Sequence, residues 1–283
     1  MEKIKILVAC HKHASVPNDE VYTPIHVGKA LHPEFDLGFI GDDTGDNISK
    51  KNASYCELTA QYWGWKNIKS EYLGLCHYRR FFETKFNANT IEQQMDGNDV
   101  ILVNPIHFNC SVHDFWMSKL IPEDVTILYL IMQKYYLEDF GHFEKFVTGN
   151  LFYPYNMFVC KKDLFDEFAQ WQFDILEKVE RVLPLSSYSR ERRIFGYIAE
   201  VLLPIYFISR GYKIKTMPIV DQIGKIAIPH WKTKVKIALQ NWYKDRKFSH
   251  NRTYTLPLGD DYLQCLKQDG IIDAIDNLRN PNN

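Results

Sequence analysis

The sequence lacks several features that would place it in a common class at once. Its 283 residues carry 34 Lys and Arg against 35 Asp and Glu, so the formal net charge of -1 gives no overall attraction to nucleic acid. The six cysteines form no C-x-x-C pair, and most of them end apolar runs. This usage predicts buried free thiols in a reducing compartment and argues against a disulfide framework and a paired-cysteine zinc site.

Long hydrophobic runs are also missing. The apolar stretch in KIKILVAC (3–10) is too short for the core of a secretory leader. The longest run, IAEVLLPIYFI, contains Glu200 and Pro204 and is too short to cross a bilayer. We therefore expect a cytoplasmic chain, at most bound peripherally to a membrane.

Familiar catalytic and phosphate-binding motifs are absent as well. The sequence contains no P-loop, no G-x-G-x-x-G, no H-E-x-x-H and no G-x-S-x-G. The chemistry must therefore be sought in less standard constellations.

The sequence does contain alternating strand and helix patterns. With 46% hydrophobic residues the chain can bury a substantial core. We expect strands at 3–10, 72–78, 99–105 and 155–160, and PIHVGKAL as a turn or short helix. Ser54 and Glu57 have the spacing of a capping box, which predicts a helix from there to about Asn67. The order predicts an α/β fold with a mostly parallel sheet flanked by helices.

The most unusual stretch is YLGLCHYRRFF (72–82), in which an apolar strand ends in His77, Tyr78, Arg79 and Arg80. If the chain stays extended, His77 and Arg79 share one face. Ligands bind at the carboxyl ends of strands in open α/β sheets, and an Arg fork suits phosphate. The stretch therefore predicts a diphosphate clamp, or else arginines paired with internal acids such as Asp42.

Three further segments carry candidate site residues. GDDTGDN (41–47) holds Asp42, Asp43, Asp46 and Asn47, either as sugar- or metal-binding groups or as a plain turn. RRIFGYIAE places Arg193, Gly196 and Glu200 on one helical stripe, for substrate contact or for close helix packing. Asn156, at the start of YNMFVC, would bind sugar hydroxyls or cap a turn.

The tail after about residue 225 has a different composition. From Lys232 to Arg252 it carries seven Lys and Arg, one acid, and interleaved Trp and Tyr. This pattern predicts either contact with an anionic membrane surface or an ordinary solvated surface. We accordingly divide the chain into a main domain, 1–225, and an extension, 226–283.

Several of these segments together resemble a known family. DDTGDNISKKNASYCELTAQYWGWKN, YLGLCHYRRFF, YNMFVCKKDLFDEF and RRIFGYIAEVLL are similar to the bacterial capsular-polysaccharide glycosyltransferases catalogued as domain of unknown function 4422. The likeness runs from about residue 4 to 220. It implies a GT-A-like nucleotide-diphospho-sugar transferase fold and a place in capsule, exopolysaccharide or O-antigen synthesis. Some members are similar to galactofuranosyltransferases that use UDP-galactofuranose.

GT-A enzymes usually end a central strand with Asp-x-Asp, which holds a divalent metal on the diphosphate. Here the comparable strand end has no such pair. We therefore expect cationic side chains to replace the metal and no cofactor beyond the UDP-sugar donor. His11 and Lys12 end the first strand, where such folds hold the nucleotide, and His77 joins the catalytic group.

The remaining candidates lie in segments that the resemblance covers, and their roles are our own hypotheses. Asp42, Asp43, Asp46 and Asn47 match the family's acidic loop, and Asn156, Arg193 and Glu200 match its later blocks. Glu200 is the expected base for an inverting displacement, with Asp42 or Asp43 in reserve. The acceptor would be a lipid-linked or oligosaccharide chain at the inner face of the membrane. The alternatives are a non-catalytic nucleotide-sugar- or glycan-binding subunit and a nucleotidyl- or phosphotransferase acting on sugar phosphates.

Overall fold

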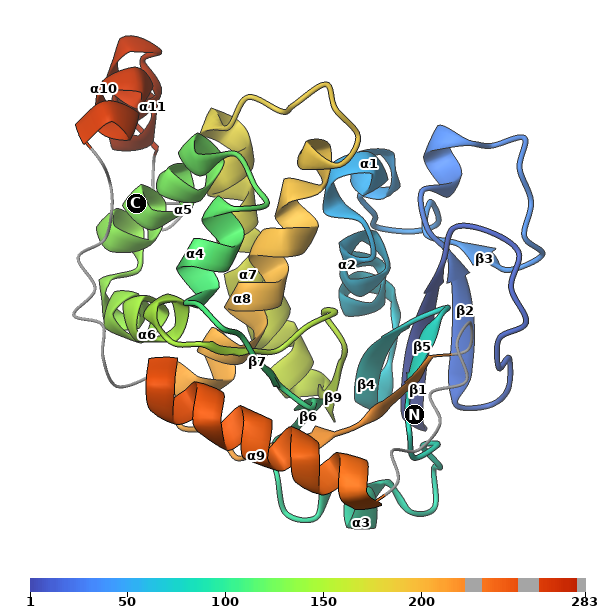
Figure 1. The fold of residues 1–283 in the computed structure, drawn as a ribbon. Coiled ribbons are helices and arrows are strands. Elements are labelled where there is room, and N and C mark those ends of the chain that lie inside the picture. The colour runs from blue at the N-terminus through green and yellow to red at the C-terminus, as the bar shows by residue number, and fades with distance from the viewer. Residues whose placement is uncertain (222–230, 249–259, 279–283) are drawn as a thin grey trace. The chain divides into compact units, whose positions relative to one another are not determined.

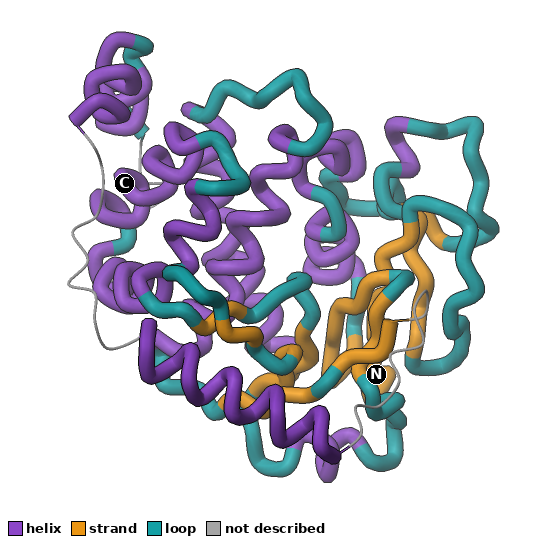
Figure 2. Tube along the Cα trace, in the orientation of Figure 1, coloured by secondary structure: helices purple, strands orange, loops and turns teal. Residues whose placement is uncertain are grey.

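The computed structural model describes residues 1–221, 231–248 and 260–278, which are traced in Figures 1 and 2. The chain clusters into two compact units. Unit 1 contains Met1–Pro105, Tyr153–Trp171 and Phe195–Pro229, and unit 2 contains Ile106–Phe152, Gln172–Ile194 and His230–Asn283. The described tail residues thus cluster with the segments 106–152 and 172–194.

The described strands of unit 1 form one mixed sheet in the order β10-β6-β9-β4-β1-β2-β3, with β5 beside β4 and β11 beside β5. They are β1 (Glu2–Cys10), β2 (Tyr22–His26), β3 (Ile40–Gly41), β4 (Ser70–His77), β5 (Arg80–Phe82), β6 (Val100–Val103), β9 (Phe158–Lys161), β10 (Ile214–Met217) and β11 (Ile219–Asp221). Strands β10, β6, β4, β1, β2 and β3 share one direction, and β9 runs against β4 and β6. The expected mostly parallel α/β sheet is confirmed.

The centre of the sheet forms where the sequence is most continuously apolar. From Ile6 to Cys10 in β1, every residue is buried. Gly74 of β4 has no room for a side chain, because a Cβ there would lie 2.7 Å from Ile6 and from Val159 and 2.9 Å from the Phe158 carbonyl oxygen. Neighbouring strands therefore pack through this glycine.

Helices cover the sheet of unit 1. They are η1 (Lys29–Leu31), η2 (Ser49–Lys51), α1 (Asn52–Tyr55), α2 (Leu58–Asn67), α3 (Ile91–Met95), the first half of α7 (Lys162–Val182) and most of α8 (Ile194–Ser209). The α2 helix packs on β1 and β4. On β9, Phe158 stacks on Phe165 of α7, and Phe168 of α7 contacts Phe207 of α8.

Two local expectations are wrong. PIHVGKAL contributes Pro24–His26 to strand β2, which pairs in parallel with β1. The expected capping box at Ser54 does not form, since the Ser54 hydroxyl donates to the Lys51 carbonyl and the helix breaks at Cys56, where φ is 54°.

Unit 2 is mainly helical. Its elements are β7 (Ile106–His107), α4 (Val112–Met117), α5 (Pro122–Tyr135), α6 (Leu137–Thr148), β8 (Leu151–Phe152), the second half of α7, η3 (Glu191–Arg193), α9 (Trp231–Phe248), α10 (Asp260–Gln268) and α11 (Ile271–Asp276). Tyr129 of α5 packs edge-to-face on Phe143 of α6. The Tyr135 hydroxyl donates to the Ile275 carbonyl oxygen at 2.6 Å, and the Leu278 carbonyl oxygen lies 2.9 Å away, so this side chain links α11 to α5.

Candidate functional site

The carboxyl ends of the parallel strands define one edge of the unit 1 sheet. Strands β1, β2 and β4 end there at Cys10, His26 and His77, and β3 ends at Gly41. The antiparallel strand β9 begins at the same edge, since Phe158 pairs with Leu75 near the end of β4. Ligands of open α/β sheets bind at such an edge. Most of the residues chosen from the sequence lie on it.

The stretch after β4 turns instead of staying extended. Tyr78 and Arg79 form the turn of a hairpin in which His77 pairs with Arg80. The expectation that His77 and Arg79 share one face of an extended strand is therefore wrong. The backbone N–H of Arg79 donates to His77 Nδ1 at 3.3 Å, so the proton of the neutral ring is on the other nitrogen, Nε2.

Several basic groups gather around the Tyr78 ring, which is itself buried. The ring centroids of His11 and His77 lie 5.0 and 4.4 Å from that of Tyr78. Lys12 Nζ and Arg79 Cζ lie 5.5 and 5.4 Å from the same centroid. The structure thus joins the end of β1 to the turn after β4, and we call His11, Lys12, His77 and Arg79 the cationic cluster, in which Lys12 and Arg79 carry the positive charge.

Arg79 itself is not neutralised. Within the described chain no carboxylate lies within ion-pair distance of its guanidinium, and its buried Nε has no hydrogen-bond acceptor. The alternative of an internal ion pair with Asp42, Asp43 or Asp46 does not hold for this arginine. A buried, unpaired donor costs about 1–3 kcal/mol, which an anionic ligand would recover.

A second group of polar side chains surrounds the turn before β9. Glu200 of α8 accepts a hydrogen bond from the Tyr155 backbone N–H at 3.0 Å. The Arg80 guanidinium lies 4.2 Å from the centroid of the Tyr155 ring, which connects this turn to the β4–β5 hairpin. Asn156 Nδ2 donates to Glu57 Oε1 and to the Gly196 carbonyl oxygen, both at 3.0 Å.

The backbone of this turn is held in an uncommon conformation. Tyr155 and Asn156 have φ angles of 81° and 45°, in the left-handed region that non-glycine residues rarely enter. Such conformations persist where surrounding contacts impose them, and they concentrate at functional sites. Here the contacts are those made by Glu57, Gly196 and Glu200.

Glu57 was missed as a site residue. Its spacing from Ser54 indicated a helix cap, whereas the break at Cys56 directs its carboxylate to Asn156. The same segment explains Gly196, because a Cβ on that residue would lie 3.3 Å from Cys56 Sγ. Close packing of α8 on this segment, and not substrate contact, accounts for the glycine.

The acidic loop after β3 is largely an internally bonded turn. Asp42 is completely buried, and its carboxylate accepts hydrogen bonds from the Gly28 and Lys29 N–H groups and the Ser49 hydroxyl. This geometry favours a structural role for Asp42 over the reserve catalytic role. Asn47 likewise bonds within the loop, through its Nδ2 to the Asp43 and Gly45 carbonyl oxygens.

Asp43 and Asp46 remain exposed on this loop. The Tyr62 hydroxyl donates to Asp46 at 3.3 Å. Strand β3 is the third neighbour of β4 in the sheet, so the loop lies roughly 14 Å from the hairpin at ~4.8 Å per strand. That separation suits the two ends of a nucleotide sugar and not two groups acting on one atom.

Arg193 lies at the amino end of the predicted helical stripe. It ends η3, before α8 begins at Ile194, and it belongs to unit 2.

His26 lies at the candidate edge and was not chosen from the sequence. It is 2% exposed, its Nδ1 has no partner within the described chain, and burial lowers the pKa of its imidazole.

Unsatisfied buried groups mark the same edge. In the described residues of unit 1, the buried side-chain polar atoms without a hydrogen-bond partner are His26 Nδ1, Arg79 Nε and Asn156 Oδ1. All three follow or end strands at the carboxyl edge, or precede the strand that starts there. Native proteins leave few such atoms, so each of these three is a position where a bound ligand or an ordered water would supply a hydrogen-bond partner.

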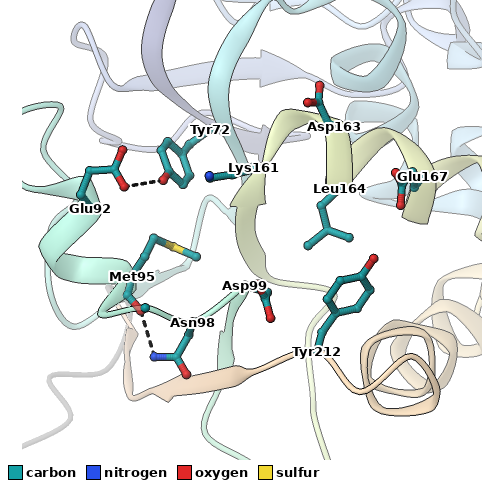
Figure 3. A pocket seen from close by; sticks show the side chains of 11 residues that line it. Tyr72, Glu92, Met95, Asn98, Asp99, Lys161, Asp163, Leu164, Glu167 and Tyr212 are labelled. Atoms are coloured by element: carbon teal, nitrogen blue, oxygen red, sulfur yellow. Dashed lines mark hydrogen bonds between the residues drawn. The ribbon is translucent and has the colours of Figure 1, made fainter.

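A cavity of about 440 Å³ lies at the opposite edge of the sheet (Figure 3). Tyr72, at the start of β4, contributes to its lining together with Asp99 and Tyr212, which precede β6 and β10. The Tyr72 hydroxyl donates to Glu92 at 2.8 Å beside it. None of the site residues chosen from the sequence lines this cavity.

In residues 1–221, 231–248 and 260–278, no three His, Cys, Asp or Glu side chains are grouped so as to hold a metal ion. The turn after β4 presents a guanidinium and no carboxylate, and hard divalent ions require oxygen ligands.

Comparison with known proteins places the chain in a family. The profile of the domain of unknown function DUF4422 matches residues 5–211. The chain belongs to the DUF4422 family. Among solved structures, it is similar to the apo structure of the WbbM bifunctional glycosyltransferase, with 30% identity and a TM-score of 0.72. The match covers 79% of this chain and 46% of WbbM, so the chain spans about half of that protein's length. A comparison with curated proteins gives no significant match.

The likeness to WbbM supports a glycosyltransferase-like architecture for this DUF4422 chain and agrees with the GT-A-like fold expected from the sequence. Its sheet edge carries the cationic cluster, the strained turn and the unsatisfied polar atoms described above.

Proposed function

We propose that this DUF4422 protein is a glycosyltransferase that moves a sugar from a UDP-sugar to a glycan acceptor. The observation that carries the proposal is the coincidence of buried, unsatisfied polar atoms with an unneutralised arginine at the carboxyl edge of the sheet. The likeness to WbbM supports the reaction class.

The cationic cluster would bind the diphosphate of the donor. Arg79 and Lys12 supply positive charge from two neighbouring strand ends, and His77 supplies a ring N–H. Charge builds on the departing diphosphate as the bond to the sugar breaks. Fixed donors aimed at that charge lower the barrier without a metal ion.

Glu200 would act as the base. It accepts the proton of the acceptor hydroxyl, whose oxygen attacks the anomeric carbon from the side opposite the diphosphate. The bond from that carbon to the phosphate oxygen breaks, and UDP leaves with the electron pair, so the configuration inverts. The N–H of Tyr155 holds one Glu200 oxygen, and Glu57 orients Asn156 beside it.

The other end of the donor would extend along the edge toward β2 and β3. His26 and the exposed Asp43 lie in that direction, where the uridine ribose or base would find them. From the family resemblance, we take UDP-galactofuranose as the first donor to test and a lipid-linked or oligosaccharide precursor of capsule, exopolysaccharide or O-antigen as the acceptor.

A donor screen tests this function directly. The purified chain is incubated with UDP-galactofuranose, UDP-galactopyranose, UDP-glucose and UDP-N-acetyl sugars, with and without oligosaccharide acceptors, and UDP release is measured. We expect release with one donor. Glu200→Gln should keep the UDP affinity within about twofold and reduce turnover by roughly 10²–10⁴-fold, the range of a general base.

The outcomes separate the proposal from its main rival. UDP-sugar binding without release under any condition would favour a non-catalytic binding subunit. Full activity of Glu200→Gln would overturn the assignment of the base, and Glu57→Gln is then the next variant to test.

A further inference from the structure

Helix α9 (Trp231–Phe248) carries an exposed apolar stripe. Val235, Leu239, Trp242 and Tyr243 are 50, 61, 59 and 56% exposed. At 100° per residue these four side chains fall within an arc of about 100° on one side of the helix. We call these four residues the α9 stripe. Exposed apolar side chains gathered on one face usually mark a binding surface.

The stripe is not the side by which α9 contacts its own unit. Lys244 Nζ donates to the His107 carbonyl oxygen at 3.4 Å, and α9 contacts β7 there. Lys244 lies roughly 150° around the helix from the centre of the stripe. The contact with β7 and the exposed stripe therefore occupy opposite sides of α9.

Positive charge accompanies the stripe. The sequence of α9 contains six Lys and Arg and one acid, Asp245, although the whole chain has a formal net charge of -1. Arg246 Cζ lies 5.4 Å from the Trp242 ring centroid, and Lys247 Nζ lies 5.6 Å from the Tyr243 centroid. Positive charges thus lie directly beside the apolar side chains. This arrangement suits a partner whose apolar interior lies beneath an anionic surface.

The helix lacks the character of a membrane span. Across residues 1–221, 231–248 and 260–278, the helices are either too short or too polar to cross a bilayer. An amphipathic helix with Trp on its apolar face and Lys and Arg around it instead lies in the plane of the lipid headgroups.

We propose that α9 docks the protein on an anionic phospholipid surface, with the α9 stripe at the boundary between headgroups and acyl chains and with Lys236, Arg246 and Lys247 near the headgroup phosphates. Phospholipid fits better than an acidic protein. The stripe is narrow and its side chains differ in shape, whereas a protein partner would need a matching surface. The flexible Lys and Arg side chains beside it can reach headgroups that have no fixed positions. The inference does not depend on the proposed sugar transfer.

Vesicle co-sedimentation of the full chain tests the proposal. Vesicles of phosphatidylcholine alone are compared with vesicles that also contain phosphatidylglycerol, at low and high salt. We expect binding only to the anionic vesicles, weakened by salt. The variant Leu239→Ala/Trp242→Ala should reduce the partition coefficient at least about tenfold, since two anchoring side chains are lost. Lys236→Glu/Lys247→Glu should reduce it comparably without altering the stripe.

Matched controls keep the test decisive. Tyr188→Ala removes an aromatic side chain that is 75% exposed outside α9 and should leave the partition unchanged. Circular dichroism and a thermal melt verify that each variant is folded. If Leu239→Ala/Trp242→Ala does not fold, Lys236→Glu/Lys247→Glu alone tests the proposal. Equal binding to neutral and anionic vesicles, or no binding to either, would overturn the proposal. So would a dimer in solution that the Leu239→Ala/Trp242→Ala change dissociates, because a second copy would then cover the stripe.

Discussion

Replacement of Arg79 by Ala perturbs the proposed diphosphate site at its least compensated group. Its guanidinium has no carboxylate partner within the described chain, and its Nε is buried without an acceptor. In the proposed function, this side chain would bind the diphosphate of the donor.

The size of the effect on binding follows from the bonds lost. A hydrogen bond to a charged group contributes about 1.5–3 kcal/mol. Loss of one such bond to the diphosphate should raise the Kd for UDP by about 10- to 150-fold. The Kd for uridine, which has no phosphate, should stay within about twofold.

The same variant should not destabilise the free protein. Removing an unsatisfied buried donor recovers about 1–3 kcal/mol. The variant also loses the contact between the Arg79 guanidinium and the Tyr78 ring, whose centroid is 5.4 Å away. That loss lowers the free energy of unfolding by about 0.5–1 kcal/mol. We therefore expect the free energy of unfolding to be unchanged or slightly higher, whereas a purely structural arginine would leave a less stable protein.

Isothermal titration calorimetry with UDP and uridine, together with urea unfolding, measures both effects. Arg210→Ala is the matched control, because Arg210 also stacks on an aromatic ring, that of Tyr206 at 4.0 Å, but follows α8 near the amino end of β10. Its UDP affinity should equal that of the wild type. An unchanged UDP affinity in Arg79→Ala, combined with a loss of stability, would refute the diphosphate site.

Three other predictions concern the metal, the sheet and a buried acid. Excess EDTA should leave transferase activity largely intact, and strict dependence on Mn²⁺ or Mg²⁺ would overturn the metal-free clamp. Gly74→Ala should lower the free energy of unfolding by about 1–3 kcal/mol through overpacking against the neighbouring strands, measured in urea. Gly141→Ala, on an exposed helix position with nothing within 4 Å of the new Cβ, should instead raise it by about 0.5–1 kcal/mol; equal effects would contradict the packing argument. Burial raises the pKa of Asp124 from 3.8 to about 7, so the folded state holds this proton more tightly and stability should fall as pH rises from about 4 to 7. Asp124→Asn should flatten that part of the stability profile, and an unaltered slope would show that other groups control it.

Much of the fold could be predicted because its central strands are continuously apolar. KIKILVAC and YLGLCH are both buried in the sheet, and their composition alone indicates parallel strands. Strand β2 was missed because it contains Pro24, which usually argues against a strand. On that side of β2, the short β3 pairs only with Ile25 and His26. No strand residue there therefore needs a hydrogen bond from Pro24, which has no N–H to donate.

The site was predicted less well because it depends on contacts between distant segments. The basic residues could be chosen from one stretch, but the hairpin turn at Tyr78 and Arg79 could not be distinguished from an extended strand. Glu57 and Asn156 are 99 residues apart in sequence, and no local pattern connects them. The Ser54–Glu57 spacing pointed to a helix cap, and a long-range contact prevailed over it.

A crystal structure of the protein with bound UDP would test the central claim most directly. The account predicts diphosphate oxygens within hydrogen-bond distance of the Arg79 guanidinium and the Lys12 ammonium, with uridine extending toward His26. Nucleotide bound instead in the cavity beside Tyr212, at the amino edge of the sheet, would contradict it.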